Sequence, residues 1–253
     1  MAVMEFLKAN LINTTTMVIA STGTGTFGYL FDRNDSLAYA TVGYTTNTST
    51  LINIEFLGPT VISGVLLKNH NLRQFRAFYN SATANTFSID VNVSSNSATS
   101  SYFAFSSVTV NSIQIQLDLA QTTDVERQIG ELIVTERRVQ FPDNPSYKDY
   151  DPSRNNTRII HRMPDGGVTA FNIKQKFKAS LNLEYASDSF TTVLSNIYEE
   201  ALPLYFLPFP TTTAWDGRAY EILWTNDFNL AHAENSKTQG FSGKVVIEET
   251  PSA

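Results

Sequence analysis

Histidine is the side chain most often used for metal binding and general acid–base chemistry, and this chain has three of them. His70, His161 and His232 lie far apart, and no two have the HxxxH or HxH spacing that brings two imidazoles to one metal ion. The chain has no cysteine, which excludes disulfides, thiolate metal sites and a cysteine nucleophile. We therefore expect no histidine-based metal centre and predict that each histidine is a loop or surface residue.

Motifs for nucleophilic and phosphate chemistry are missing from the sequence. It has no GxSxG, no GxxxxGK[ST], no HExxH and no GxGxxG followed by an acid. The glycine-rich segment 21–28 lacks the lysine and the helix of a phosphate-binding loop, so we expect a turn there. Glu199-Glu200 and Glu248-Glu249 are adjacent pairs, whose side chains point in different directions on a helix or strand. We predict that the protein is not an enzyme. A glycan-active enzyme with two carboxylates from distant strands is the remaining catalytic alternative.

One oxygen-rich segment could hold a cation. Residues 30–36 place Asp32, Asn34 and Asp35 close together, and Ca²⁺ takes carboxylate and amide oxygens as ligands. The segment does not match the EF-hand loop, which has acids at alternating positions and a closing glutamate. The alternative is a turn in which these side chains hydrogen-bond their own backbone. Ca²⁺ is the one cofactor that this segment could bind, and the sequence indicates no other.

The elements that must position these residues are mostly strands. In the first half of the chain, apolar and polar residues alternate in segments 50–57, 75–80, 87–93 and 112–119, the pattern of strands with one buried face. Turn-rich segments separate these strands at a spacing typical of sandwiches and barrels. The sequence predicts a mainly β protein whose N-terminal part, residues 1–140, is an antiparallel β-sandwich.

The second half combines strands with one helix. Segment 141–156 holds three prolines and several Asn, Asp and Ser residues, and we predict a linker there. Residues 157–253 are predicted to form a β-sandwich with one packed helix at 187–201. From Phe190, apolar residues recur at i+3, i+4, i+7, i+8 and i+11, and Leu202-Pro203 ends the helical pattern.

Charge and hydropathy limit the classes of binding partner that the chain can have. The 253-residue chain has a net charge of −6 and only 17% charged residues, so neither nucleic acid nor an anionic membrane is expected as a partner. The first ten residues include Glu5 and lack the basic and apolar regions of a signal peptide. No apolar run has the ~20 residues that span a bilayer. We expect a protein made in the cytoplasm and not secreted by a signal peptide.

The first half resembles the galactose-binding-like, or discoidin-type, jelly roll. The matching segments are 30–32, 51–56, 60–67, 112–117 and 129–134. Segment 67–72 is similar to a His-Asn-Leu signature found in bacteriophage virion versions of this fold. The chain lacks the paired cysteines and the early tryptophan of animal members. In this resemblance Glu131 stands at the usual acid, and it joins Asp32 and Asp35 as a candidate Ca²⁺ ligand.

The second half resembles bacteriophage distal-tail and tail-tube domains, in which the sheets of neighbouring subunits join around a ring. The matching features are the long alternating segment 171–185, the helix, segment 202–210, a hairpin with Trp215 and Trp224, and a closing strand at 243–249. The resemblance implies a structural subunit of a phage tail, baseplate or collar ring. The implied partners are copies of the chain in a homo-oligomeric ring and neighbouring virion proteins. The implied location is the virion, with the protein made in the host cytoplasm.

Aromatic side chains are the candidate assembly residues, since such residues are enriched at interface anchors. They are Tyr205, Phe206 and Phe209, with a small core under the helix as the alternative. The alternative function is a carbohydrate-binding or adhesion module that contacts host surface glycans, because sugar sites combine an aromatic platform with polar groups. The candidate sugar-contacting residues are Tyr44, His70, Arg73 and Arg76.

Overall fold

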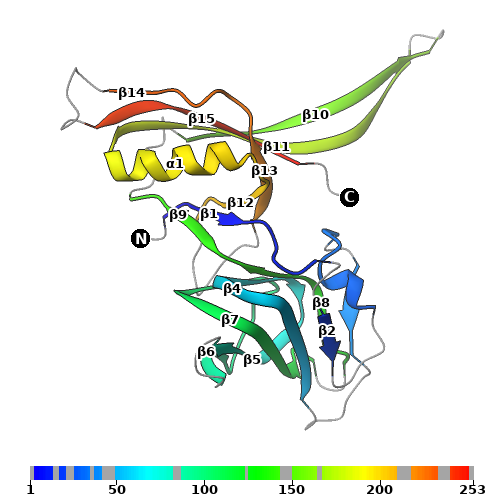
Figure 1. Cartoon of the computed structure of the whole chain (residues 1–253). Coiled ribbons are helices and arrows are strands. Elements are labelled where there is room, and N and C mark those ends of the chain that lie inside the picture. Colours follow the sequence, from blue (N-terminus) through cyan, green and yellow to red (C-terminus); the bar gives the residue numbers. More distant parts are fainter. Residues whose placement is uncertain are drawn as a thin grey trace.

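The computed structural model is shown in Figure 1 and consists of two antiparallel sheets and one α-helix. It describes residues 3–13, 17–20, 26–34, 37–41, 49–81, 87–122, 125–142, 150–163, 167–209, 218–232 and 240–250. The mainly β fold predicted from the alternating sequence is confirmed. Within the part that the structure describes, no helix is long and apolar enough to cross a membrane.

The first sheet lies in the lower part of Figure 1 and has the strand order β3-β8-β4-β7-β5-β6, with β2 paired to β4. Its elements are β2 (Met17–Ala20), the short 3₁₀ helix η1 (Phe27–Leu30), β3 (Tyr39–Ala40), β4 (Thr50–His70), β5 (Leu72–Ser81), β6 (Phe87–Val93), β7 (Ser101–Ala120) and β8 (Gln128–Thr135). The long strands β4 and β7 change register twice, between Glu55 and Thr60 and between Ile62 and Gly64. Such bulges let long strands bend.

Strict alternation builds the core of this sheet. Ile52 lies opposite Ile115, and Ile54 lies opposite Ile113, and all four side chains are buried. Asn53, between the two β4 isoleucines, is only partly buried. Fully burying an aliphatic side chain of this size stabilises a fold by roughly 1.5–3 kcal/mol. A few such cross-strand pairs are therefore enough to fix the register of β4 against β7.

The second sheet has the order β10-β11-β15-β13-β12-β1-β9, with β14 paired to β15. Its strands are β1 (Glu5–Lys8), β9 (Arg137–Gln140), β10 (Tyr150–Arg162), β11 (Val168–Ala186), β12 (Leu204–Leu207), β13 (Tyr220–Trp224), β14 (Leu230–His232) and β15 (Phe241–Glu249). The N-terminal strand β1 lies between β9 and β12, although these three strands are far apart in the sequence.

Sheet membership differs from the predicted boundaries at two places. Strands β1 and β9 fall within 1–140 but belong to the second sheet, because Phe6 and Val139 are buried in the core of that sheet. Residues 150–156, expected to be linker, form the first half of β10 and pair with β11. Pro152 fits there because β10 is an edge strand, where a missing N–H breaks no ladder.

The predicted helix is confirmed as α1 (Asp188–Glu200). The Ser187 hydroxyl accepts a hydrogen bond from the backbone N–H of Phe190 at 3.2 Å and so caps the first turn. At the other end, Ala201 has a φ of 49° and ends the helix in the left-handed region. The face that carries Leu194 and Ile197 is buried against the second sheet, as the spacing predicted.

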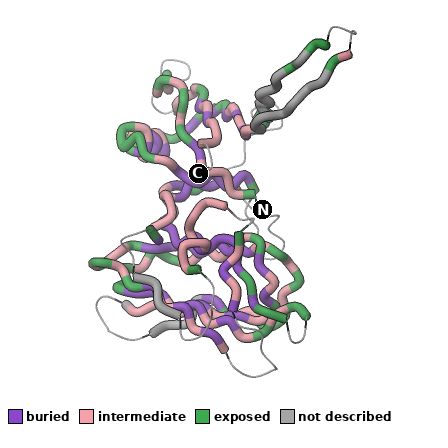
Figure 2. Tube along the Cα trace, turned by 90° about the vertical axis from the view of Figure 1, so that its right-hand side faces the viewer, coloured by how far each residue is buried: buried purple, intermediate pink, exposed green. Residues whose placement is uncertain are grey.

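The two sheets meet at a narrow junction with its own small core. Figure 2 shows buried residues continuing through the waist between the upper and lower parts of the molecule. The buried side chains of this core come from both sheets: Leu7, Leu66, Tyr102, Ile133, Tyr205 and Leu207. Beside it, the Tyr102 hydroxyl donates to Glu5 Oε2 at 2.5 Å, and Arg137 lies 3.5 Å from the other oxygen of that carboxylate.

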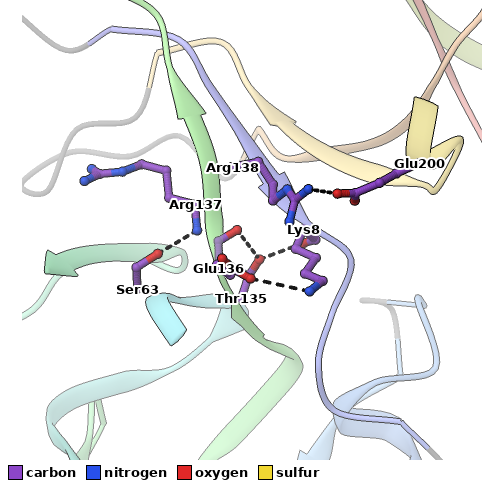
Figure 3. A network of polar contacts seen from close by, with 7 residues as sticks. All are labelled: Lys8, Ser63, Thr135, Glu136, Arg137, Arg138 and Glu200. Atoms are coloured by element: carbon purple, nitrogen blue, oxygen red, sulfur yellow. Dashed lines mark hydrogen bonds and ion pairs between the residues drawn. The ribbon is translucent and has the colours of Figure 1, made fainter. Parts of the chain in front are cut away.

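A polar network follows the segment that connects β8 to β9 (Figure 3). The Thr135 hydroxyl donates to the carbonyl of Lys8 at 2.6 Å, and the backbone N–H of Arg137 donates to Ser63 Oγ at 2.6 Å. Arg138 forms an ion pair with Glu200 at the end of α1. The network thus ties the first sheet, the β1 and β9 strands and the helix to one another.

Strands β10 and β11 extend beyond the second sheet as a projecting ribbon, which we call the arm and define as residues 154–177. Strand β11 pairs with β15 only from Lys178 to Ala186, so its preceding residues pair with β10 alone. Figures 1 and 2 show the ribbon reaching away from the rest of the molecule. Ile160, Met163 and Val168, near its outer end, are 59%, 48% and 63% exposed.

Candidate functional site

A pocket of about 390 Å³ lies at the root of the arm, where it joins the second sheet. Four aromatic side chains and two prolines form most of its lining, with one hydroxyl residue and one charged residue. The lining residues are Tyr150, Pro152, Ser153, Phe177, Pro208, Phe209, Arg218 and Tyr220. We call this the root pocket. Apolar walls with a few polar groups are typical of small-molecule sites.

Four segments of the second sheet bring these residues together. Tyr150 and Pro152 come from the start of β10, opposite Leu181 and Ala179 of β11. Pro208 and Phe209 directly follow β12, and Tyr220 begins β13 opposite Phe206. The pocket therefore exists only when β10, β11, β12 and β13 are assembled.

The rings of the pocket hold one another in place. Phe177 and Tyr220 stack with their ring centroids 3.8 Å apart and their planes 7° apart. Tyr150 meets Phe209 edge to face at 5.8 Å. Buried Phe206 lies behind them, 6.0 Å from Phe177 and 6.4 Å from Tyr150. Phe209 is 47% exposed, so its ring is available to a ligand at the mouth of the pocket.

Burial and the neighbouring side chains determine the protonation of one polar group in the pocket, the Tyr150 hydroxyl. Burial, and secondarily the neighbouring Tyr220, raise the pKa of Tyr150 to about 12, while Arg218 acts in the opposite direction. The Tyr150 hydroxyl is therefore neutral at physiological pH and able to donate and accept hydrogen bonds. The backbone N–H of Phe177 donates to Glu249 Oε2 at 2.7 Å. This hydrogen bond joins the β11 side of the pocket to the last residue of β15.

The predicted sugar-contacting residues do not form this site. His70 is buried with 2% exposure, its Nε2 lies 3.0 Å from Ser101 Oγ, and its Nδ1 accepts from the N–H of Leu72 at 3.2 Å. Burial lowers the pKa of His70 to about 4. It is therefore a core residue of the first sheet, contrary to the expected loop or surface position, because β4 ends with its last side chain pointing inward.

The other members of that set are spread over the first sheet. The Arg76 side chain donates to Asp118 at 3.2 Å on the neighbouring strand β7, whereas Arg73 is exposed. Tyr44 lies outside the described residues. As a set, these residues remain a prediction that the structure does not gather into one site.

The candidate Ca²⁺ ligands have other partners. Asp32 Oδ1 accepts from the backbone N–H of Asn34 at 2.9 Å, which is the alternative turn considered from the sequence. Glu131 is buried at the junction, 3.2 Å from Lys68 Nζ and 3.3 Å from the Tyr205 hydroxyl. Asp35 lies outside the described residues. Across the ranges that the structure describes, no three His, Asp or Glu side chains form a group that could hold a metal ion.

The candidate assembly residues are divided between three environments. Strand β12 alternates between two cores, so Tyr205 is buried at the junction and Phe206 in the second core. Both are inside the chain, which contradicts an interface role. Phe206 lies in the core that the helix covers, as in the alternative, whereas Tyr205 lies in the junction core. Phe209 follows Pro208, two residues beyond the end of β12. It is exposed and belongs to the root pocket.

A second pocket, of about 70 Å³, lies at the junction and is lined by charged residues. Arg33 Nε lies 2.6 Å from Glu221 Oε2, and another guanidinium nitrogen of Arg33 donates to Thr250 Oγ1 at 2.8 Å. With Lys68 and Glu131 also paired, the lining is occupied by internal ion pairs. We interpret this small pocket as part of the packing between the sheets.

Sequence reasoning missed most of the root pocket. Tyr150, Pro152 and Ser153 fell within the expected linker, and Phe177 was read only as an apolar position of a strand. The signal was the co-occurrence of Tyr150 and Pro152 in one segment, together with Pro208-Phe209 after a short strand. Neither feature shows by itself that the two segments meet.

Comparison with known proteins gives fold similarity for about half of the chain. Neither a family model nor a curated protein sequence matches it. Chitosan-binding module 1 of a Paenibacillus sp. IK-5 chitosanase/glucanase is 13% identical, with 47% of this chain and 93% of that chain covered and a TM-score of 0.41.

Two further carbohydrate-binding modules show the same level of similarity. The Clostridium perfringens module CpGH89CBM32-5, in complex with GalNAc-β-1,3-galactose, is 14% identical over 47% of this chain and 94% of its own, with a TM-score of 0.40. The family 32 carbohydrate-binding module of Streptococcus pneumoniae EndoD is 14% identical over 51% and 99%, with a TM-score of 0.41. Similarity at this level concerns fold, and the function has to be argued from the chain itself.

Proposed function

We propose that this protein binds saccharides through the root pocket. The observation that carries the proposal is the composition of the pocket: aromatic and proline side chains around about 390 Å³, with a tyrosine hydroxyl, a serine and an arginine in the lining. A sugar ring has apolar C–H faces and a rim of hydroxyl groups. The aromatic faces of Phe209 and Tyr150 can pack against the C–H faces of the sugar, and the polar groups of the lining can hydrogen-bond its hydroxyl groups.

The geometry of the pocket also favours a preformed site. The stacked pair Phe177 and Tyr220 and the edge-to-face pair Tyr150 and Phe209 restrict one another's rotamers. A ligand therefore meets rings that are already ordered, and binding costs less side-chain entropy. The pocket volume of about 390 Å³ lies within the range of small-molecule pockets, roughly 300–1,000 Å³.

Direct titration of the full chain tests the proposal. The first probes are GalNAc-β-1,3-galactose, present in the complex of the Clostridium perfringens module, and chitotriose, present in the complex of chitosan-binding module 2 of the same Paenibacillus sp. IK-5 enzyme, followed by a wider glycan panel. Because Phe209 is partly exposed, Phe209→Ala removes a pocket ring at little cost to folding. We expect the dissociation constant to rise by roughly 2- to 13-fold, the effect of losing about 0.5–1.5 kcal/mol of ring contact.

The matched control is Tyr185→Ala, which removes a 64% exposed aromatic side chain from the far end of β11, outside the root pocket. It is expected to leave binding unchanged. Tyr150→Phe keeps the ring and removes only the hydroxyl, so it reports whether that group contacts the ligand. Equal losses in Phe209→Ala and Tyr185→Ala, or a panel with no binding glycan, would contradict the proposal.

A structural role in a larger assembly is the second candidate function, and the projecting arm is the observation that favours it. The assignment to a phage tail, baseplate or collar ring remains a prediction from the sequence resemblance. The two functions are compatible, since the root pocket and the outer arm use different residues.

A further inference from the structure

The arm exposes a strand edge and apolar side chains at once. Strand β10 is the terminal strand of the second sheet, so one row of its backbone N–H and C=O groups has no ladder partner within the described sheet. An isolated two-stranded ribbon is marginally stable in water. Ile160, Met163 and Val168 add exposed apolar surface near its outer end. Together these features indicate a surface that is covered in the working state of the protein.

The charge of the arm is opposite to that of the rest of the chain. Residues 154–177 contain five Lys and Arg and one Asp, which gives a net charge of +4. The whole chain has a net charge of −6, so the remainder carries −6 − 4 = −10. The basic residues of the arm are Arg154, Arg158, Arg162, Lys174 and Lys176. A basic ribbon therefore projects from an acidic body.

We propose that the arm docks on the acidic body of a second copy of this chain. Opposite net charges on arm and body attract during encounter and set the orientation of the two copies. The free edge of β10 and the exposed apolar residues then supply contacts that charge alone does not. Nucleic acid is a poorer occupant, because the body that follows the arm would bring ten net negative charges towards the phosphates.

The same charges decide the symmetry of the contact. Two arms laid side by side would bring +4 against +4, so an arm-to-arm dimer is disfavoured. An arm-to-body contact uses different surfaces on the two copies and is heterologous. After the first contact, the pair keeps one free arm on one copy and one free body surface on the other. Such contacts continue until they close into a ring, or they grow into a filament.

Sedimentation of the purified full chain at increasing concentration, at about 50 mM and about 500 mM NaCl, tests the proposal. We expect species larger than a dimer at low salt and dissociation at high salt, because screening weakens exposed charge contacts. The variant Arg162→Glu/Lys176→Glu takes the arm from +4 to neutral. It is expected to raise the dissociation constant for self-association about tenfold or more.

The matched control is Arg73→Glu/Lys244→Glu, which makes the same change in total charge at two exposed positions on the body. It is expected to leave self-association within about threefold of the unmodified chain. A chain that stays monomeric at both salt concentrations would overturn the proposal, as would equal effects of the two double variants. A dimer that never grows further would overturn the arm-to-body geometry.

A duplex DNA of about 20 base pairs serves as the competing occupant in the same low-salt buffer. If the DNA binds the unmodified chain and not the arm variant while the chain remains monomeric, the arm has a nucleic-acid partner and the proposal fails. If the DNA does not bind and self-association persists, the second copy is the occupant. Neither Arg162 nor Lys176 lines the root pocket, so saccharide titration of the arm variant is an independent check on its folding.

Discussion

The core of the first sheet is mainly aliphatic, whereas the core of the second sheet is rich in phenylalanine. Among the described residues, the first core contains the rings of Tyr39 and Phe75 beside many Ile, Leu and Val side chains. The second core contains Phe6, Phe141, Phe177, Phe190 and Phe206. Aliphatic side chains on facing strands interdigitate and leave little space. The root pocket opens where the phenylalanine core reaches the surface, since Phe177 belongs to both.

The largest difference between the two cores is expected from truncating one central side chain in each. Phe206→Ala removes a ring that contacts Phe6, Phe177 and Tyr150, so the pocket loses its support as well as its packing. We expect a loss of about 3–5 kcal/mol in the free energy of unfolding, together with loss of saccharide binding.

Ile115→Ala is the counterpart in the first core and is expected to cost about 2–5 kcal/mol while leaving the pocket intact. Urea unfolding and saccharide titration measure the two effects separately. If Ile115→Ala impairs binding as strongly as Phe206→Ala does, the two cores are not independent supports and the comparison fails.

A second contrast is how the free energy of unfolding changes with pH in the first sheet and at the junction. Burial holds the pKa of His70, in the first sheet, at about 4, below its ordinary value of 6.5. The unfolded chain therefore binds the proton more readily, and stability from this site is lost as the pH falls from 6.5 to about 4. The complete loss in the free energy of unfolding through His70 is about 3 kcal/mol. Urea unfolding between pH 7 and pH 4 measures it, and His70→Gln is expected to flatten this part of the profile.

Two carboxyl groups at the junction act with the opposite sign. Burial raises the pKa of Glu5 and of Glu221, and hydrogen bonds or ion pairs with Tyr102, Arg137 and Arg33 oppose that effect. The folded chain then holds these protons more tightly than the unfolded chain, so their contribution is largest below pH 4.5 and falls as the pH rises. A His70→Gln variant that still loses stability on acidification to pH 5 would show that this balance of groups is wrong.

The smallest effect is expected at the junction between the sheets. Tyr102→Phe removes the 2.5 Å hydrogen bond to buried Glu5 and leaves that carboxylate with Arg137. We expect a cost of about 1.5–3 kcal/mol, typical of a hydrogen bond to a charged group. Tyr205→Phe is the matched change, and it is expected to cost less because its bond to Glu131 is longer, at 3.3 Å, and Lys68 remains as partner. Equal costs in urea unfolding would contradict this ranking.

Local patterns in the sequence predicted most of the secondary structure. Alternation over 50–57 and 112–119 gave strands with the observed buried faces, and the spacing from Phe190 gave the helix within one residue at each end. These features depend on neighbours along the chain, which a sequence displays directly. The mainly β character follows from the same patterns.

What could not be predicted depends on contacts between distant segments. The four-residue strand β1 carries no periodic signal, and its partners β9 and β12 lie about 130 and 200 residues later. An apolar run such as 204–207 shows that side chains are buried but does not show that they alternate between two cores. For the same reason Tyr205 and Phe206 were expected at an interface, and Tyr150 was placed in a linker instead of a pocket.

The position of β1 between β9 and β12 determines the order in which the molecule can form. All strands of the first sheet lie between residues 17 and 135, so that sheet can complete its pairing before the later part of the chain is synthesised. Strand β1 precedes them in the chain but cannot complete the second sheet until residues 204–207 are available. Closing so long a loop is slow. The second sheet, and with it the root pocket and the arm, is therefore the last part of the molecule to reach its working form.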